Sequence, residues 1–179
     1  MFADSVFGLV GGMVFTTVLL IACVADLRTR RIPNGLVGVL GAAGLVYSAA
    51  SGPLGQGLMH GIGGLGVGLL IWIPFYLLRL LGAGDVKLFA AAGAWLGPAA
   101  TLEAALLAGI VGGVMAAAWL IWRQGLRQTA FIPLWFVAMR RARAMPHGSL
   151  AGTRYPLPYG VALAAGAAVV AWFPSLILS

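Results

Sequence analysis

The stretch Leu80-Leu81-Gly82-Ala83-Gly84-Asp85-Val86-Lys87-Leu88-Phe89 places an acid and a base, hinged on two glycines, at the start of an apolar run. The surrounding chain is 61% hydrophobic and only 8% charged. An aspartate beside a membrane segment is costly, by about 2.5–3.5 kcal/mol at mid-bilayer on insertion scales. We therefore interpret this stretch as a functional site and expect the rest of the chain to support it.

The composition predicts an integral membrane protein. A chain of 179 residues with a mean hydropathy of +1.02 has too few polar groups to cover a soluble surface. Six apolar runs predict an all-α, polytopic fold with six transmembrane helices in a single domain, residues 1–179. Their approximate ranges are 5–25, 35–50, 57–81, 86–100, 102–122 and 157–177, with one long polar loop at 123–156.

Local signals add detail to these helices. The run at 86–100 would span only about 22 Å, against a hydrocarbon core of about 30 Å, so we expect the glycine motif before it to be irregular backbone below the membrane surface. The pairs Gly64/Gly68 and Gly109/Gly113 have the small-xxx-small spacing of close helix contacts. Asn34, after Pro33, is predicted to N-cap the second helix. The apolar segment 131–139 predicts a helix lying in the membrane interface.

The basic residues predict the orientation of the chain. All eleven Lys and Arg fall in three regions: 28–31, the flanks of the glycine motif, and 123–154. Alternating the six helices from an N-terminus outside puts all three regions on the cytoplasmic side of the membrane. The net charge of +7 is therefore interpreted as membrane orientation, and no nucleic acid partner is expected. The same alternation puts Asp26 and Asp85 on the cytoplasmic face.

Two carboxylates on one face, without metal ligands or a His triad, indicate acid–base hydrolysis. Two aspartates that share a site do not easily both ionise, so one holds a proton while the other deprotonates an attacking water. Asp85 starts a helix, where the dipole favours the anion, and Asp26 ends one. We therefore assign Asp85 as the resting base and Asp26 as the proton carrier. No cofactor or metal is expected.

Each residue also has a simpler interpretation. Asp85 is suited to capping a helix, Asp26 to pairing with Arg28 or Arg30, and Lys87 to anchoring the chain at the membrane surface. A small proton-coupled transporter or channel would use both acids as a proton or cation relay, but it predicts further polar residues along the apolar runs. A non-catalytic scaffold protein that keeps the fold without activity is a further alternative.

Three blocks of the chain together resemble the type IV prepilin peptidases, which are GxGD aspartic peptidases. They are Asp26 with Arg31-Ile32-Pro33-Asn34, then Gly82-Ala83-Gly84-Asp85-Val86-Lys87, and Leu157-Pro158-Tyr159-Gly160-Val161-Ala162. The compact size is most similar to the peptidases of tight-adherence (Flp) pilus systems. Presenilin-type GxGD proteases share the glycine motif, but their Pro-Ala-Leu signature is replaced here by Pro158-Tyr159-Gly160.

The resemblance implies that Asp26 and Asp85 are the catalytic dyad of an endopeptidase. Its substrate would be a prepilin or pseudopilin whose short basic leader is removed at the cytoplasmic membrane face, with pilus-assembly machinery as a possible partner. Residues of the shared blocks would support the motif or the approach of the substrate: Gly82, Gly84, Lys87, Pro33, Asn34, Pro158, Tyr159 and Gly160. Larger members also methylate the new N-terminus and carry a segment with paired cysteines. Methylation is not expected here, because Cys23 is the only cysteine.

Overall fold

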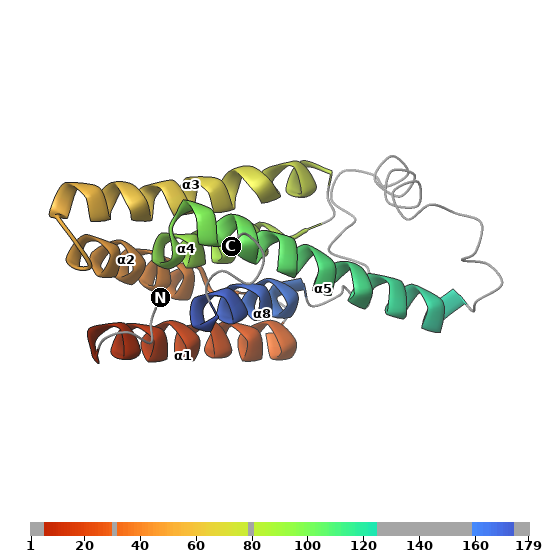
Figure 1. The fold of residues 1–179 in the computed structure, drawn as a ribbon. Coiled ribbons are helices and arrows are strands. Elements are labelled where there is room, and N and C mark those ends of the chain that lie inside the picture. Colours follow the sequence, from red (N-terminus) through yellow and green to blue (C-terminus); the bar gives the residue numbers. More distant parts are fainter. Residues whose placement is uncertain (1–5, 30–31, 79–80, 125–158, 174–179) are drawn as a thin grey trace.

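The computed structural model describes residues 6–29, 32–78, 81–124 and 159–173, and these residues contain six helices and no strand. The helices are α1 (Val6–Thr29), α2 (Asn34–Ala50), α3 (Leu54–Leu77), α4 (Ala83–Leu96), α5 (Pro98–Gln124) and α8 (Tyr159–Trp172). In Figure 1, α3 lies along one side of the bundle, α1 and α8 lie along the other, and α2 and α4 lie between them. The prediction of an all-helical fold is confirmed.

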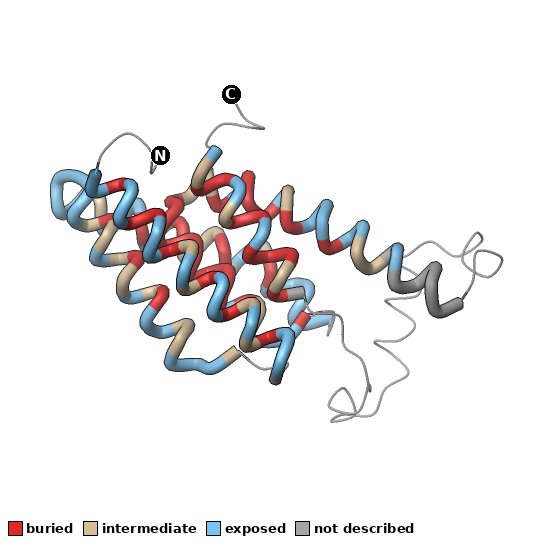
Figure 2. Tube along the Cα trace, turned by 90° about the horizontal axis from the view of Figure 1, so that it is seen from below, coloured by how far each residue is buried: buried red, intermediate tan, exposed pale blue. Residues whose placement is uncertain are grey.

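The central element is α4, which packs against α2, α3, α5 and α8. Every residue from Leu88 to Leu96 is buried, so the helix is covered on all sides. A helix that is apolar all round has no face suited to water, and burial at the centre of a bundle satisfies that requirement. Figure 2 shows the buried residues on the inner sides of the packed helices. The motif that opens α4 is therefore held by the best-packed part of the protein.

Glycines allow α3 to approach α4 closely, as the sequence predicted for one of the two glycine pairs. A Cβ atom on Gly64 would collide with the Gly93 carbonyl, and one on Gly68 would lie 2.9 Å from the Cα atom of Ala90. The other pair, Gly109 and Gly113, has no described neighbour within 4 Å of such a Cβ atom. Both glycines are exposed, so the close contact expected at Gly109 and Gly113 is not made with any of the described helices.

Buried hydrogen bonds fix α2 against α4. The Trp95 indole Nε1–H donates to the Leu40 carbonyl over 2.8 Å, and the Ser48 hydroxyl donates to the Ala94 carbonyl over 2.7 Å. Both bonds pair groups that would be costly to leave unsatisfied inside an apolar bundle. They therefore set the position of α4 relative to α2 at the end of α4 that lies away from the glycine motif.

Three of the described helices are long and apolar enough to cross a membrane: Val6–Arg28, Leu54–Leu77 and Pro98–Ala116. This agrees with a membrane protein. Helices α2 and α8 are apolar but shorter, and α4 has 14 residues. Six crossings therefore stay a prediction. The expected interfacial helix at 131–139, and most of the loop predicted at 123–156, lie outside the described residues.

Two boundary predictions are corrected. The glycine motif is irregular backbone only up to Gly82, which is extended, because α4 begins at Ala83 and includes Gly84 and Asp85 in its first turn. Asn34 does not cap α2 but is its first residue, and Pro33 holds the N-cap position without a side-chain cap bond. A proline nitrogen has no hydrogen to donate, so Pro33 suits the boundary, and its carbonyl accepts from the Leu36 N–H over 3.1 Å.

Candidate active site

Asp26 lies in the last turn of α1 and is only 8% exposed. The apolar run predicted for the first helix stops at residue 25, but the helix continues to Thr29 and carries Asp26 with it. A carboxylate in a last turn faces the negative end of the helix dipole, and burial removes the water that would stabilise its charge. Both effects make this position an unfavourable one for a negative charge.

Asp85 lies in the first turn of α4, as the third residue of the helix. The Gly82 N–H donates to its Oδ2 atom over 3.3 Å, which is the one half of a capping box that is open to a glycine in the N-cap position. The simpler interpretation of Asp85 as a helix cap is therefore correct for one carboxylate oxygen. The other oxygen, Oδ1, faces Gly160 of α8.

Gly160 is where the two carboxyl groups converge. A Cβ atom on this buried glycine would lie 2.8 Å from Asp26 Oδ2 and 3.3 Å from Asp85 Oδ1. Two carboxyl groups that both lie in van der Waals reach of one point are close neighbours. The structure thus brings together two of the residues singled out in the sequence, from α1 and α4, and lines the meeting point with a third from α8.

The electrostatics of Asp85 reflect this arrangement. Asp85 precedes the apolar run 86–100 and lies outside the helices long enough to cross a membrane. Burial, together with the nearby charge of Asp26, raises the pKa of the Asp85 carboxyl to about 6, and the hydrogen bond from Gly82 opposes that rise. Asp85 therefore keeps a proton beside an ionised Asp26 up to about pH 6, as expected of two carboxyl groups that share one site.

The remaining predicted residues lie around this point to different degrees. A Cβ atom on Gly84 would lie 3.5 Å from the Ile32 side chain, so the α1–α2 connection packs against the motif. Pro33 and Asn34 follow Ile32 and are exposed. Ile32 was missing from the predicted support residues, although it belongs to the block Arg31-Ile32-Pro33-Asn34. Pro158 lies outside the described residues, and of Tyr159 only the backbone is described, as the first residue of α8.

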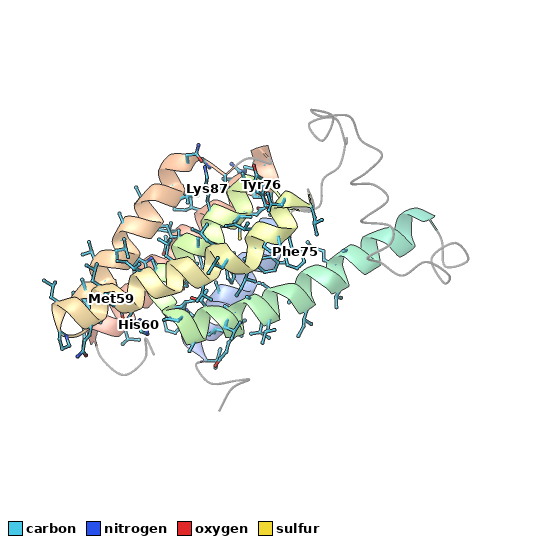
Figure 3. All side chains as sticks on the ribbon, turned by 90° about the horizontal axis from the view of Figure 1, so that it is seen from above. Met59, His60, Phe75, Tyr76 and Lys87 are labelled. Atoms are coloured by element: carbon cyan, nitrogen blue, oxygen red, sulfur yellow. The ribbon has the colours of Figure 1, made fainter. Side chains whose placement is uncertain are left out.

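Lys87 is not directed toward the two carboxyl groups. It is exposed and lies two residues after Asp85, which on an α-helix is a rotation of about 200°. In Figure 3, Lys87 lies at the same end of the bundle as Phe75 and Tyr76, whereas Met59 and His60 mark the other end of α3. The fold therefore places the Lys87 side chain near the end of the bundle that holds the two aspartates, but on another side of α4.

The fold and site define a class of protein: a helical membrane protein with two aspartates paired near one end of its bundle. The sequence model of the "Type IV leader peptidase family" matches residues 13–117, which include both aspartates and more than half of the chain. The chain belongs to this family. No solved structure gives a significant match.

Three curated relatives carry the name "Prepilin leader peptidase/N-methyltransferase". The protein of Klebsiella pneumoniae is 38% identical over 108 residues, which are 56% of this chain and 46% of the relative. That of Dickeya chrysanthemi is 31% identical over 136 residues, 72% of this chain and 46% of the relative. That of Pectobacterium carotovorum subsp. carotovorum is 35% identical over 123 residues, which are 66% of this chain and 43% of the relative. The chain thus spans about half the length of the curated relatives it matches.

Proposed function

We propose that this chain is a membrane-embedded aspartic endopeptidase that removes the short basic leader of prepilins or pseudopilins. The observation that carries the proposal is the convergence of Asp26 and Asp85 at Gly160. Membership of the type IV leader peptidase family supports the substrate class. Two adjacent carboxyl groups that share one proton can supply the acid and the base of peptide hydrolysis without a cofactor.

In the proposed mechanism Asp85 is the base and Asp26 is the acid. Asp85 removes a proton from a water molecule, whose oxygen then forms a bond to the scissile carbonyl carbon. Asp26 donates its proton to the carbonyl oxygen, which gives a neutral tetrahedral diol. Collapse of the diol breaks the C–N bond, as the proton held by Asp85 moves to the leaving nitrogen and a diol hydroxyl returns its proton to Asp26. This cycle restores both aspartates.

The positions of the two residues support these roles. Asp85 accepts a backbone N–H bond in a first turn, where the helix dipole stabilises an anion. Asp26 is the more buried of the two and lies in a last turn, where the anion is disfavoured. The raised pKa of Asp85 favours the opposite assignment, because a charge on Asp26 is one of its causes, so the proposed roles rest on the helix dipole and on the deeper burial of Asp26.

We further propose that the site works at the cytoplasmic face of a bacterial inner membrane, with the N-terminus outside, six crossings and one domain over residues 1–179. Arg28, in the last turn of α1, supports this orientation because it lies at the Asp26 end of that helix. A prepilin of a tight-adherence (Flp) pilus is the proposed substrate, pilus-assembly machinery is a possible partner, and methylation of the product is not expected.

The experiment that tests this function is cleavage of a prepilin by the full chain reconstituted in liposomes. We expect mass spectrometry to find one cut between the basic leader and the apolar segment, with an unmethylated new N-terminus when S-adenosylmethionine is present. The mature pilin, which lacks the leader, is the matched control and should stay intact. Intact prepilins from several pilus systems, in the presence of correctly folded protein, would contradict the proposal.

The pH dependence of cleavage is a second prediction. The mechanism needs one proton on the pair. The pKa of about 6 belongs to the loss of the last proton, because the charge of an ionised Asp26 is one of its causes, so activity should fall as the pH rises through about 6. At pH 7 roughly a tenth of the maximal rate should remain, since one pH unit above a pKa leaves about that fraction protonated. Initial rates between pH 4.5 and 8, in liposomes shown to stay intact, measure this. A rate that stays flat from pH 5 up to pH 8 would argue against a pair that works with one shared proton.

A further inference from the structure

Helix α8 stands between the two helices that carry the aspartates. It packs against α1 and against α4, as well as against α5. A ring contact joins Phe15 of α1 and Trp95 of α4, with centroids 5.6 Å apart, about 15 Å along the helices from the two carboxyl groups. At the site itself, Gly160 lies between α1 and α4.

The position of α8 is fixed by contacts that do not involve the aspartates. Its last residue, Trp172, donates an indole hydrogen bond to the Thr16 hydroxyl of α1 over 3.0 Å. In its middle, a Cβ atom on Gly166 would lie 2.7 Å from the Ala104 carbonyl oxygen, so α8 and α5 are in backbone contact. A helix held at its end and its middle presents its first turn at a defined place.

We propose that Gly160 is a positioning residue that sets the separation of the Asp26 and Asp85 carboxyl groups, with α8 as the spacer between their helices. This inference rests on the proposed function and adds the element that tunes its site. A hydrogen atom at position 160 leaves room for both carboxyl groups, whereas a methyl group would fall within 2.8 Å of Asp26 Oδ2 and 3.3 Å of Asp85 Oδ1. One or both carboxyl groups would then have to move apart.

The test is Gly160→Ala, measured beside two matched glycine-to-alanine controls. Gly166→Ala disturbs the same helix against the Ala104 carbonyl and Ala108, away from the dyad, and Gly109→Ala adds a methyl group where no described atom lies within 4 Å. We expect Gly160→Ala to lower kcat about 100-fold, the size of effect that a 1 Å misplacement produces, with little change in KM. Gly109→Ala should match the wild type.

The alkaline limb of the pH–rate profile, which reports the loss of the last proton from the pair, separates positioning from simple destabilisation. Moving the carboxyl groups apart weakens their repulsion, so in Gly160→Ala the limb should move to lower pH by on the order of half a unit. Gly166→Ala should lower the amount of folded protein and leave the limb in place. An unmoved limb in Gly160→Ala, or an equal shift in Gly166→Ala, would overturn the inference.

A titration that needs no substrate keeps the inference distinct from the proposed function. Asp4 is the only other aspartate of the chain, so Asp4→Asn protein labelled with ¹³C-aspartate reports the pair alone in infrared spectra. We expect Gly160→Ala to lower the higher titration midpoint of the pair by a similar amount. If no prepilin is cleaved but this midpoint moves, the function fails and the positioning role stands; if the midpoint does not move, the positioning role fails.

Discussion

Replacing either Asp26 or Asp85 by asparagine should abolish prepilin cleavage, with a loss of about 10²–10⁴-fold in kcat for each single variant. Asparagine keeps the size of the side chain but neither takes up a proton from water nor donates one as a carboxylic acid does. Asp85→Asn removes the proposed base, and Asp26→Asn removes the proposed acid. Because the two carboxyl groups act as one unit at Gly160, the double variant should be no slower than the worse single variant.

The matched control for these variants is Glu103→Gln. Glu103 is the other buried carboxylate among the described residues, at 6% exposed, and it lies on α5 away from the pair. The same exchange of carboxylate for amide there should leave cleavage unchanged. Cleavage by wild type that persists in Asp26→Asn or Asp85→Asn would make that aspartate structural. A wild-type chain that conducts protons across liposomes without cleaving prepilins would favour the transporter.

Gly64→Ala should destabilise the protein strongly, by about 3 kcal/mol, because the added methyl group would collide with backbone atoms. It would meet the Gly93 carbonyl and would lie 2.8 Å from the Cα atom of Gly97. Neither atom belongs to a side chain that can rotate away, so α3 and α4 must separate. Loss of this contact should also displace the first turn of α4, which carries Asp85.

Gly66→Ala is the matched control, two residues along the same helix. No described atom lies within 4 Å of a Cβ atom at this position, so alanine should be neutral or stabilise the helix by about 0.5–1 kcal/mol. Unfolding in SDS, followed by circular dichroism of protein in detergent micelles, compares the three proteins. Equal stability of Gly64→Ala and Gly66→Ala would show that α3 and α4 are not held in close backbone contact.

The two glycine pairs show where the sequence pattern and the structure differ. Gly64/Gly68 and Gly109/Gly113 have the same spacing, yet only the first pair meets a described helix. The spacing shows that one face of a helix carries small residues, but whether another backbone packs against that face depends on the other helices. The N-cap predicted at Asn34 fails for a related reason, because Asn34 is already the first residue of its helix. The same holds for the irregular backbone predicted at Gly84 and Asp85, which are helical. Packing moves helix boundaries by one or two residues from where local signals put them.

The sequence by itself determined the class of fold and the two acids. Apolar runs can satisfy their backbone groups in a membrane only as helices or closed barrels, and runs of this length favour helices. An aspartate at the edge of such a run is costly, and the alternation of helices puts Asp26 and Asp85 on the same face, which singled them out. Local rules of this kind depend on neighbours in the chain, and a sequence displays those directly.

Only the tertiary structure decided how the two carboxyl groups meet. Asp26 and Asp85 are separated by two helices in the chain. Their approach depends on Gly160 of α8, which lies more than seventy residues after Asp85. The sequence could mark Gly160 through a motif but not its contact with both acids. Which side chains converge is set by the packing of helices distant in sequence, and the free energy of that packing is summed over contacts that no local pattern encodes.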